Sequence, residues 1–167
     1  AGTGGVGQAA IQVAKEIGLE IFATAGSPEK RSFLKEQGIE HVFDSRSLDF
    51  AEEVLKVTHG RGVDAVLNSL AGDFIPKNFS VLAPFGRYLE IGKIDVYNNS
   101  KVGLEALRNN ISVHIIDLAQ LMEHRPHEFA DMLEILCDKF EKGIYRPIPV
   151  RAEGKRGSGG KHGRALQ

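Results

Sequence analysis

Short apolar segments alternate along the chain with segments in which apolar residues recur at helical spacing. The apolar segments predict strands at residues 20–25, 41–44, 63–68, 87–91 and 111–116. The periodic segments predict helices at residues 8–17, 28–37, 49–59, 73–82 and 126–142, with a shorter helix at 104–108. Strands that alternate with helices are typical of a parallel sheet with helices on both faces. The pattern therefore predicts an α/β fold, a Rossmann-type doubly wound parallel sheet.

Turn-forming residues support several of these boundaries. Gly18 and Gly38 follow predicted helices, where glycine readily takes the left-handed conformation that ends a helix. Ser27 and Pro28 suit the N-cap and the first position of the second helix. Residues 144–150 contain two prolines, which disfavour both a helix and a central strand, so we expect that segment to be extended.

The N-terminal residues contain a glycine motif. Gly2, Gly4 and Gly7 fit the pattern G-x-G-x-x-G, in which glycines permit a tight turn and a close approach of the backbone to a pyrophosphate. The helix that follows would direct its free N–H groups toward that phosphate. We therefore take Gly4, Gly5, Val6 and Gly7 as cofactor-binding candidates. Glycine-rich turns also occur in methyltransferases, in flavoproteins and in ordinary loops, so the motif alone leaves these alternatives open.

The residues after the strand at 20–25 indicate which nicotinamide cofactor would bind. NAD sites usually place an acidic residue there, about 20 residues after the glycines, to bind the ribose 2′-hydroxyl. This chain has Ser27 at that point, with Lys30 and Arg31 one turn later. A hydroxyl with two cations suits a 2′-phosphate, so the sequence predicts NADPH. The alternative is that both cations are solvated helix residues.

Six residues follow three further predicted strands, at the edge where ligands bind in sheets of this kind. They are Asn68, Ser69, Leu70, Gly92, Lys93 and Asp117. The first four are candidates for contact with a cofactor, and the last two are candidates for catalysis. The alternatives are a simple polar loop at 68–70, a solvated lysine, and a salt bridge between Lys93 and Asp117 without a catalytic role.

Composition and charge argue against several other classes of function. The chain has 167 residues, of which 42% are hydrophobic and 26% are charged, as expected for one globular domain. The net charge of −1 gives no indication of binding to nucleic acid or to an anionic membrane. No apolar run would span a bilayer and no signal peptide is evident, so we expect a cytoplasmic protein.

The single cysteine and the C-terminal residues complete this picture. One cysteine, Cys137, permits no internal disulfide and argues against a thiolate-rich zinc site, so we predict no metal and expect a packed core thiol. Residues 151–167 are rich in Gly, Lys and Arg and nearly free of apolar residues, and we expect a disordered basic tail. The predicted organisation is a cofactor-binding domain at 1–150 followed by this tail.

Four segments together resemble the enoyl reductase domain of type I polyketide synthases and animal-type fatty acid synthases. This domain belongs to the zinc-free branch of the medium-chain dehydrogenase/reductase superfamily. The segments are residues 4–10, 24–31, 62–71 and 87–95, and the resemblance covers roughly residues 1–150. The first segment is shared widely across the superfamily. The sequences LNSL at 67–70 and EIGK at 90–93 are much more specific to the synthase branch.

The resemblance implies an activity and its partners. The reaction would be NADPH-dependent reduction of the α,β double bond of an enoyl thioester carried on the phosphopantetheine of an acyl carrier protein. Other synthase domains would lie in the parent chain, which would be able to form a homodimer. Lys93 and Asp117 match two residues considered as proton donors in the family. Ser27, Lys30 and Arg31 match its contacts with the 2′-phosphate.

Two departures from the family pattern change what we expect of this chain. The family has a substrate-binding domain and a first Rossmann strand ahead of the glycine loop, whereas this sequence begins inside the loop. That strand is central in the order 3-2-1-4-5-6, so we expect two separated half-sheets with exposed edges. We also expect the fragment to be inactive alone. The residues after Val150 do not resemble the family.

Alternative functions remain open at this point. A quinone oxidoreductase of the same superfamily would share the glycine loop and the preference for NADPH, but not the EIGK segment. A non-catalytic nucleotide-binding module would bind the cofactor without turnover. A methyltransferase is less well supported, because the strand at 20–25 is not followed by an acidic partner for the ribose.

Overall fold

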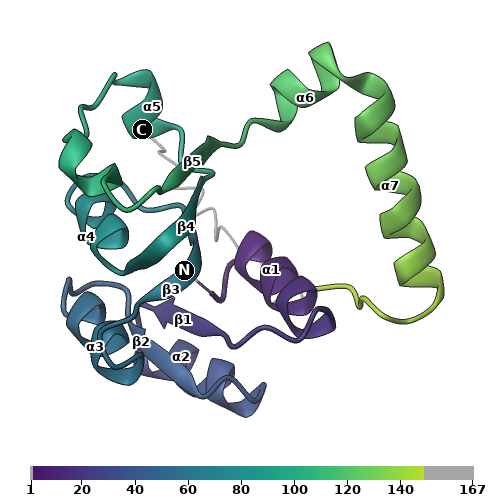
Figure 1. The fold of residues 1–167 in the computed structure, drawn as a ribbon. Helices are drawn as coiled ribbons and strands as arrows, with labels where there is room; N and C mark the ends of the chain where they lie inside the picture. The colour runs from purple at the N-terminus through teal and green to yellow at the C-terminus, as the bar shows by residue number, and fades with distance from the viewer. Residues whose placement is uncertain (1, 149–167) are drawn as a thin grey trace, which may run out of the picture.

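The computed structural model describes residues 2–148, in which strands and helices alternate (Figure 1). The strands are β1 (Phe22–Ala25), β2 (His41–Asp44), β3 (Val63–Asn68), β4 (Leu82–Glu90) and β5 (Ser112–Ile115). Every pair of neighbouring strands is parallel. This arrangement confirms the predicted α/β fold class. The expected basic tail at 151–167 lies outside the described residues.

Helices connect the strands at nearly all of the predicted places. They are α1 (Gly5–Glu16), α2 (Pro28–Glu36), α3 (Phe50–Val57), α4 (Phe74–Ser80), α5 (Ile94–Tyr97), α6 (Leu118–His124) and α7 (Pro126–Glu141), with the 3-10 helix η1 at Leu104–Leu107. Gly18 and Gly38 end α1 and α2 with φ angles of 71° and 82°, as predicted. The hydroxyl of Ser27 caps α2 by accepting a hydrogen bond from the N–H of Lys30.

The strands of the described region form two sheets rather than one. One sheet has the order β1-β2 and the other has the order β3-β4-β5. The separation agrees with the expectation of two half-sheets. In the second sheet, Asn68, Glu90 and Ile115 lie side by side at the ends of their strands. Parallel strands end at one edge, so this register brings together the residues that follow the strands.

Three apolar clusters hold the helices against the sheets. The first joins α1 and α2 to β1 through Ile11, Ala23 and Leu34. The second lies under α3, where Phe50 and Val54 pack against residues from strands of both sheets. The third joins α4 and η1 to β3 and β4 around Phe79 and Tyr88, whose rings stack at a centroid distance of 4.4 Å. The second cluster is therefore the apolar core that the two sheets share.

The structure corrects the predicted boundary between α4 and β4. The sequence predicted a helix to residue 82 followed by a turn and a strand from 87, but α4 ends at Ser80 and β4 begins at Leu82. Val63 pairs with Leu82 and Ala65 pairs with Arg87, so residues between them bulge out of the ladder. Proline cannot donate to a ladder and Phe85 has a φ of 65°, which explains why the turn signal at 84–86 marks a bulge.

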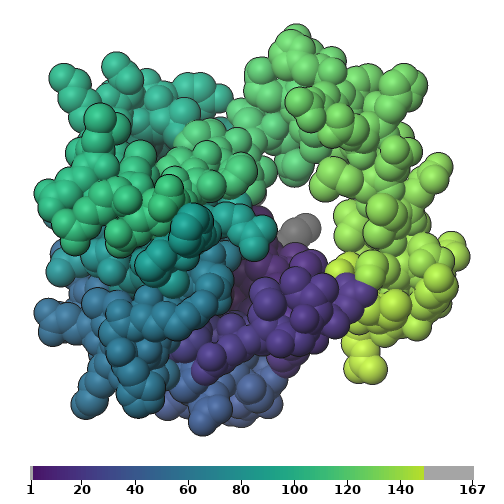
Figure 2. Space-filling model, viewed as in Figure 1, coloured from purple at the N-terminus to yellow at the C-terminus, as the bar shows by residue number. Residues whose placement is uncertain are grey.

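Two helices extend away from the sheets. Figure 1 shows α6 and α7 as an arm, and Figure 2 shows the opening between this arm and the body of the protein. The sequence analysis predicted neither α6 nor the short helix α5, and it expected Cys137 in α7 to be buried. Cys137 is exposed, and no residue of α7 is buried. The expectation of a core thiol was therefore wrong: the apolar stripe of α7 does not face the sheets.

The end of the arm is attached to α1. The carboxylate of Glu16 accepts hydrogen bonds from Lys139 and from the hydroxyl of Tyr145. The side-chain amide of Gln12 donates to the carbonyl of Arg146 at 3.1 Å and accepts from its N–H at 2.7 Å. These polar contacts fix the chain beyond α7 against the helix that follows the glycine loop. No helix of residues 2–148 is long and apolar enough to cross a membrane.

Candidate functional site

The glycine loop leads directly into α1, with Gly4 as the N-cap and Gly5 as the first helical residue. The first N–H groups of a helix have no partner within it, so those of Gly5, Val6 and Gly7 can bind an anion. The first turn contains no acidic residue that would offset the positive end of the helix dipole. A Cβ on Gly5 would meet no atom within 4 Å, and Val6 is exposed. The loop is therefore open and fits a phosphate group.

The side chain of Gln8 is hydrogen-bonded to the glycine loop, and the sequence analysis did not anticipate this contact. Its amide nitrogen donates to the carbonyl of Gly2 at 2.9 Å, and its amide oxygen accepts from Gln37 at 2.8 Å. The N–H of Gly2 in turn donates to the carbonyl of Thr24 at 2.8 Å, which ties the loop to β1. Gln8 is buried, and its polar side chain on the inward face of α1 was the signal available in the sequence.

The residues predicted to bind a 2′-phosphate lie after β1, but they are not equally available. Lys30 is exposed at the start of α2 and Ser27 caps that helix. The guanidinium of Arg31 donates to the carbonyl of Ala25 at 3.1 Å and forms an ion pair with Asp44 at 3.0 Å. Arg31 thus connects β1 with β2, and its charge is already partly balanced.

Arg46 is a further cation at this edge, and the sequence analysis missed it. The backbone N–H of Arg46 donates to a carboxylate oxygen of Asp44 at 2.8 Å, and the side chain of Arg46 lies against Gly26. A Cβ on Gly26 would lie 3.0 Å from Nε of Arg46. Because β1 and β2 are parallel neighbours, the residues after β2 come beside those after β1, and this rule could have identified Arg46 from the sequence.

The side chain of Asn68 is enclosed at the end of β3. Its nitrogen donates to Glu90 and to the carbonyl of Leu70, each at 2.7 Å. Its oxygen accepts from the N–H of Leu70 at 3.1 Å and from the amide of Asn78 at 2.9 Å. Both ends of the Asn68 amide are therefore engaged within the protein. The expected contact between residues 68–70 and a cofactor stays a prediction, and Ser69 is the exposed residue among them.

Glu90 is a buried carboxylate at the end of β4. Its Oε2 accepts from the hydroxyl of Tyr88 and from Asn68, each at 2.7 Å, and its Oε1 accepts from the N–H of Gly92 at 2.6 Å. Burial, followed by the bond to Glu90, raises the pKa of the Tyr88 hydroxyl well above its ordinary value. The hydroxyl of Tyr88 therefore remains a donor to Glu90.

Lys93 and Asp117 form an ion pair between the segments that follow β4 and β5. Nζ of Lys93 lies 3.0 Å from Oδ2 of Asp117, while Oδ1 accepts from the N–H of Ala119 at 3.0 Å and caps α6. The hydrogen bond to Asp117 raises the pKa of Lys93. The bond from Lys93, followed by that from Ala119, lowers the pKa of Asp117. Both groups are charged at neutral pH.

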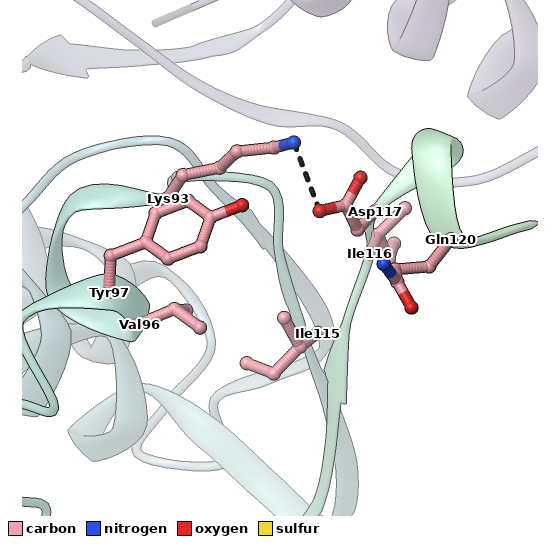
Figure 3. Close-up of a pocket in the computed structure, with 8 residues that line it drawn as sticks. Lys93, Val96, Tyr97, Ile115, Ile116, Asp117 and Gln120 are labelled. Atoms are coloured by element: carbon pink, nitrogen blue, oxygen red, sulfur yellow. Dashed lines mark hydrogen bonds and ion pairs between the residues drawn. The ribbon is translucent and has the colours of Figure 1, made fainter.

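A cavity of about 300 Å³ lies beside this pair (Figure 3). Its lining consists of Gly92, Lys93, Val96, Tyr97, Ile115, Ile116, Asp117 and Gln120. Three aliphatic side chains form much of its wall, and the hydroxyl of Tyr97 is directed toward the ion pair in Figure 3. Val96 and Tyr97 lie in residues 94–103, which carry no clear periodic pattern, and the sequence analysis took Ile115 and Ile116 only as strand residues.

The predicted site residues fall into two groups, one around the glycine loop and the end of β1, and one around the segments that follow β3 and β4. The glycine loop lies beside β1, whose end carries Ser27 and Lys30. The N–H of Ile91 donates to the carbonyl of Asn68 at 3.0 Å, so residues 68–70 and residues 92–93 are neighbours. Residues 2–148 contain no group of three or more His, Cys, Asp or Glu side chains placed to bind a metal ion.

The chain is similar to known proteins in both sequence and structure. A family model described as zinc-binding dehydrogenase matches residues 5–137. The phthioceranic/hydroxyphthioceranic acid synthase of Mycobacterium tuberculosis is 52% identical over 132 residues, which cover 79% of this chain. That match covers 6% of the synthase, so the chain spans a small part of the length of the curated relatives it matches.

Two solved structures correspond to two of the functions that the sequence left open. The nucleotide-binding subdomain of the enoylreductase domain of PpsC from M. tuberculosis has a TM-score of 0.81 and 45% identity. It is matched over 87% of this chain and 81% of that one. A quinone oxidoreductase from Pseudomonas syringae has a TM-score of 0.73 and 26% identity, over 87% of this chain and 45% of its own. The chain is more similar to the former in both sequence and structure.

Proposed function

We propose an enzymatic function for this chain, which belongs to the zinc-binding dehydrogenase family and, within it, to the enoyl reductase domains of polyketide synthases. The proposed activity is NADPH-dependent reduction of the α,β double bond of an enoyl thioester on an acyl carrier protein. This chain is the cofactor-binding part of the enzyme. The observation that carries the proposal is the ion pair of Lys93 and Asp117 beside an apolar cavity, in a chain of this family.

The proton donor in this proposal is Lys93. A nicotinamide cofactor held at the glycine loop would supply the hydride that adds to the β-carbon of the thioester. The electron pair of the double bond then moves toward the thioester carbonyl, and the α-carbon must receive a proton. Lys93 carries that proton at neutral pH as an ordinary lysine does, and its bond to Asp117 raises its pKa further, whereas the pKa of Asp117 is lowered and its carboxyl group is ionised. Asp117 accordingly holds the ammonium group in place.

The cavity and the edge of β1 support the choice of substrate and cofactor. The aliphatic residues Val96, Ile115 and Ile116 suit the hydrocarbon part of an acyl chain. Lys30 and Arg46 offer positive charge near Ser27, which favours a 2′-phosphate over a free hydroxyl. The described residues do not form a donor set for zinc, despite the family's descriptive name, and no step of the proposal is assigned to a metal.

The proposal is tested in the complete parent protein, since the curated relatives are far longer than this chain. Crotonyl thioester and a quinone are offered with NADPH and with NADH, in the wild type and in Lys93→Met. We expect reduction of the thioester with NADPH, little turnover of the quinone, and loss of thioester reduction in the variant. Preferential turnover of the quinone would replace the proposal with an oxidoreductase of that class.

Two further experiments address this chain alone. We expect the isolated chain to bind NADPH more tightly than NADH, as a larger rise in its melting temperature, because a ligand of the folded state raises stability. We also expect the isolated chain to be inactive. Binding without turnover, even in the complete parent protein, would identify a non-catalytic nucleotide-binding module instead.

A further inference from the structure

Glu90 is hydrogen-bonded to the residues that immediately precede both candidate catalytic residues. Among residues 2–148, it is the only buried side chain that carries a carboxylate. Oε1 accepts from the N–H of Gly92 at 2.6 Å, immediately before Lys93. The backbone carbonyl of Glu90 accepts from the N–H of Ile116 at 2.8 Å, immediately before Asp117. One residue therefore holds the segments that carry both members of the ion pair.

The surroundings of Glu90 show that its position is tightly defined. Asn68 and Tyr88 donate to Oε2 at 2.7 Å, so three donors surround the carboxylate. Asn68 is itself held by Asn78 and by the backbone of Leu70. No buried side-chain N or O atom in the described part of the chain lacks a hydrogen-bond partner. A fully satisfied buried network of this kind is rigid and specifies one arrangement.

The network also explains why residue 92 is glycine. A Cβ at Gly92 would lie 2.7 Å from Oε1 of Glu90, which is too close for a carbon atom. The carboxylate therefore occupies the space beside the backbone at the point where the chain leaves β4. The requirement at this glycine is spatial and arises from Glu90.

We propose that Glu90 is a positioning residue that sets the geometry of Lys93 and Asp117, and this inference rests on the proposed enoyl reduction. It acts through its side chain on the segment before Lys93 and through its backbone on the segment before Asp117. The carboxylate suits this role because both of its oxygens are acceptors. An amide in its place would set an NH₂ group against either Gly92 or the donors Asn68 and Tyr88.

The first test compares Glu90→Gln with Glu105→Gln in the complete parent protein. Glu105 is a matched control, since it is exposed on η1 and, among residues 2–148, its carboxylate pairs with Arg108 alone. We expect Glu90→Gln to lower kcat about tenfold or more, because hydrogen bonds to charged groups are worth about 1.5–3 kcal/mol. Equal kcat values for Glu90→Gln and the wild type would overturn the proposal.

A double-mutant cycle distinguishes positioning from a general loss of stability. If Glu90 acts through Lys93, Glu90→Gln should add little to the loss of kcat caused by Lys93→Met. Independent, additive losses would overturn the proposal. If Glu90→Gln reduces the yield of folded protein, Tyr88→Phe replaces it in the cycle, because it removes one donor and leaves the carboxylate in place.

Amide hydrogen exchange on the complete protein separates failure of this inference from failure of the proposed function. We expect Glu90→Gln to speed exchange in a peptide that covers residues 91–93, where the side chain of Glu90 accepts from Gly92. A peptide that covers residues 116–117 should stay unchanged, because the backbone carbonyl of residue 90 remains. Glu105→Gln should leave both peptides unchanged. This readout holds whether or not the wild type reduces an enoyl thioester. Unchanged exchange at residues 91–93 in Glu90→Gln would show that this side chain does not position the segment before Lys93.

Discussion

Asp117 uses its two carboxylate oxygens for two different partners. Oδ2 lies 3.0 Å from Nζ of Lys93, and Oδ1 accepts from the N–H of Ala119 at 3.0 Å. The same side chain therefore caps α6 and fixes the ammonium group at the edge of the cavity. The start of α6 and the candidate proton donor are thus structurally linked.

The basic limb of the pH profile should report this ion pair. A general acid is active while it is protonated, so kcat should fall as pH rises through the pKa of Lys93. Asp117 raises that pKa, and the limb of the wild type should lie above the ordinary value of lysine. Asp117→Asn removes the negative charge, so the limb should move to lower pH. The measurement is kcat against pH with saturating enoyl thioester and NADPH.

Two further variants complete this prediction. Lys93→Met should lower kcat about 100-fold or more, because it removes the general acid. Asp131→Asn, at an exposed position of α7, makes the same chemical change as Asp117→Asn away from the cavity and should leave the profile unchanged. A limb that stays in place in Asp117→Asn would show that another group donates the proton.

Lys30 should determine the preference between the two nicotinamide cofactors. The proposed 2′-phosphate would form a charge-assisted hydrogen bond with this exposed lysine, worth about 1.5–3 kcal/mol. Lys30→Ala should therefore raise the Kd of NADPH about tenfold or more and leave that of NADH nearly unchanged. Titration by protein fluorescence or calorimetry measures both constants. Lys35→Ala, at the other end of α2, is the matched control. Equal weakening of both cofactors would count against a 2′-phosphate contact.

The order and type of most elements could be predicted, because local patterns determine them. Apolar strands, glycine helix ends and the Ser27 cap depend on neighbouring residues, and the structure has them where the sequence indicates. The start of β4 was not predictable in this way, since it depends on pairing of Leu82 with Val63 across a bulge. The capping role of Asp117 was the available signal for α6, but it had been interpreted only as candidate chemistry.

The site could be predicted at the level of strand ends and not at the level of contacts. Lys93 and Asp117 meet because the ends of parallel strands share one edge, a rule that applies to the sequence directly. The same rule predicted that Asn68 would contact a cofactor. In the structure its side-chain amide is hydrogen-bonded to Glu90, Leu70 and Asn78. Cys137 was assigned to the core because amphipathic spacing shows that a face is apolar, but not what packs against it.

Gly62 should tolerate substitution less well than Gly60, although both have left-handed backbone. Their φ angles are 83° and 81°, and an L-residue in this conformation costs about 1–2 kcal/mol. A Cβ on Gly60 would meet no atom within 4 Å, whereas one on Gly62 would overlap the carbonyl oxygen of Val81. Gly62→Ala should therefore lose about 1–3 kcal/mol more than Gly60→Ala in chemical denaturation. Equal losses would mean that the start of β3 moves away from β4 without cost.

The attachment of α7 to α1 should weaken in acid. Hydrogen bonds from Lys139, and then from Tyr145, hold the pKa of Glu16 below its ordinary value. A lowered folded-state pKa means that this contribution to stability is complete above the ordinary pKa of glutamate and is lost as pH falls through the lower value. We expect Tyr145 fluorescence, taken as the difference between the wild type and Tyr145→Phe, to change in that range while far-ultraviolet circular dichroism stays constant. Glu16→Gln should abolish the change, and Glu36→Gln should keep it. An identical titration in Glu16→Gln would show that another carboxyl group controls this contact.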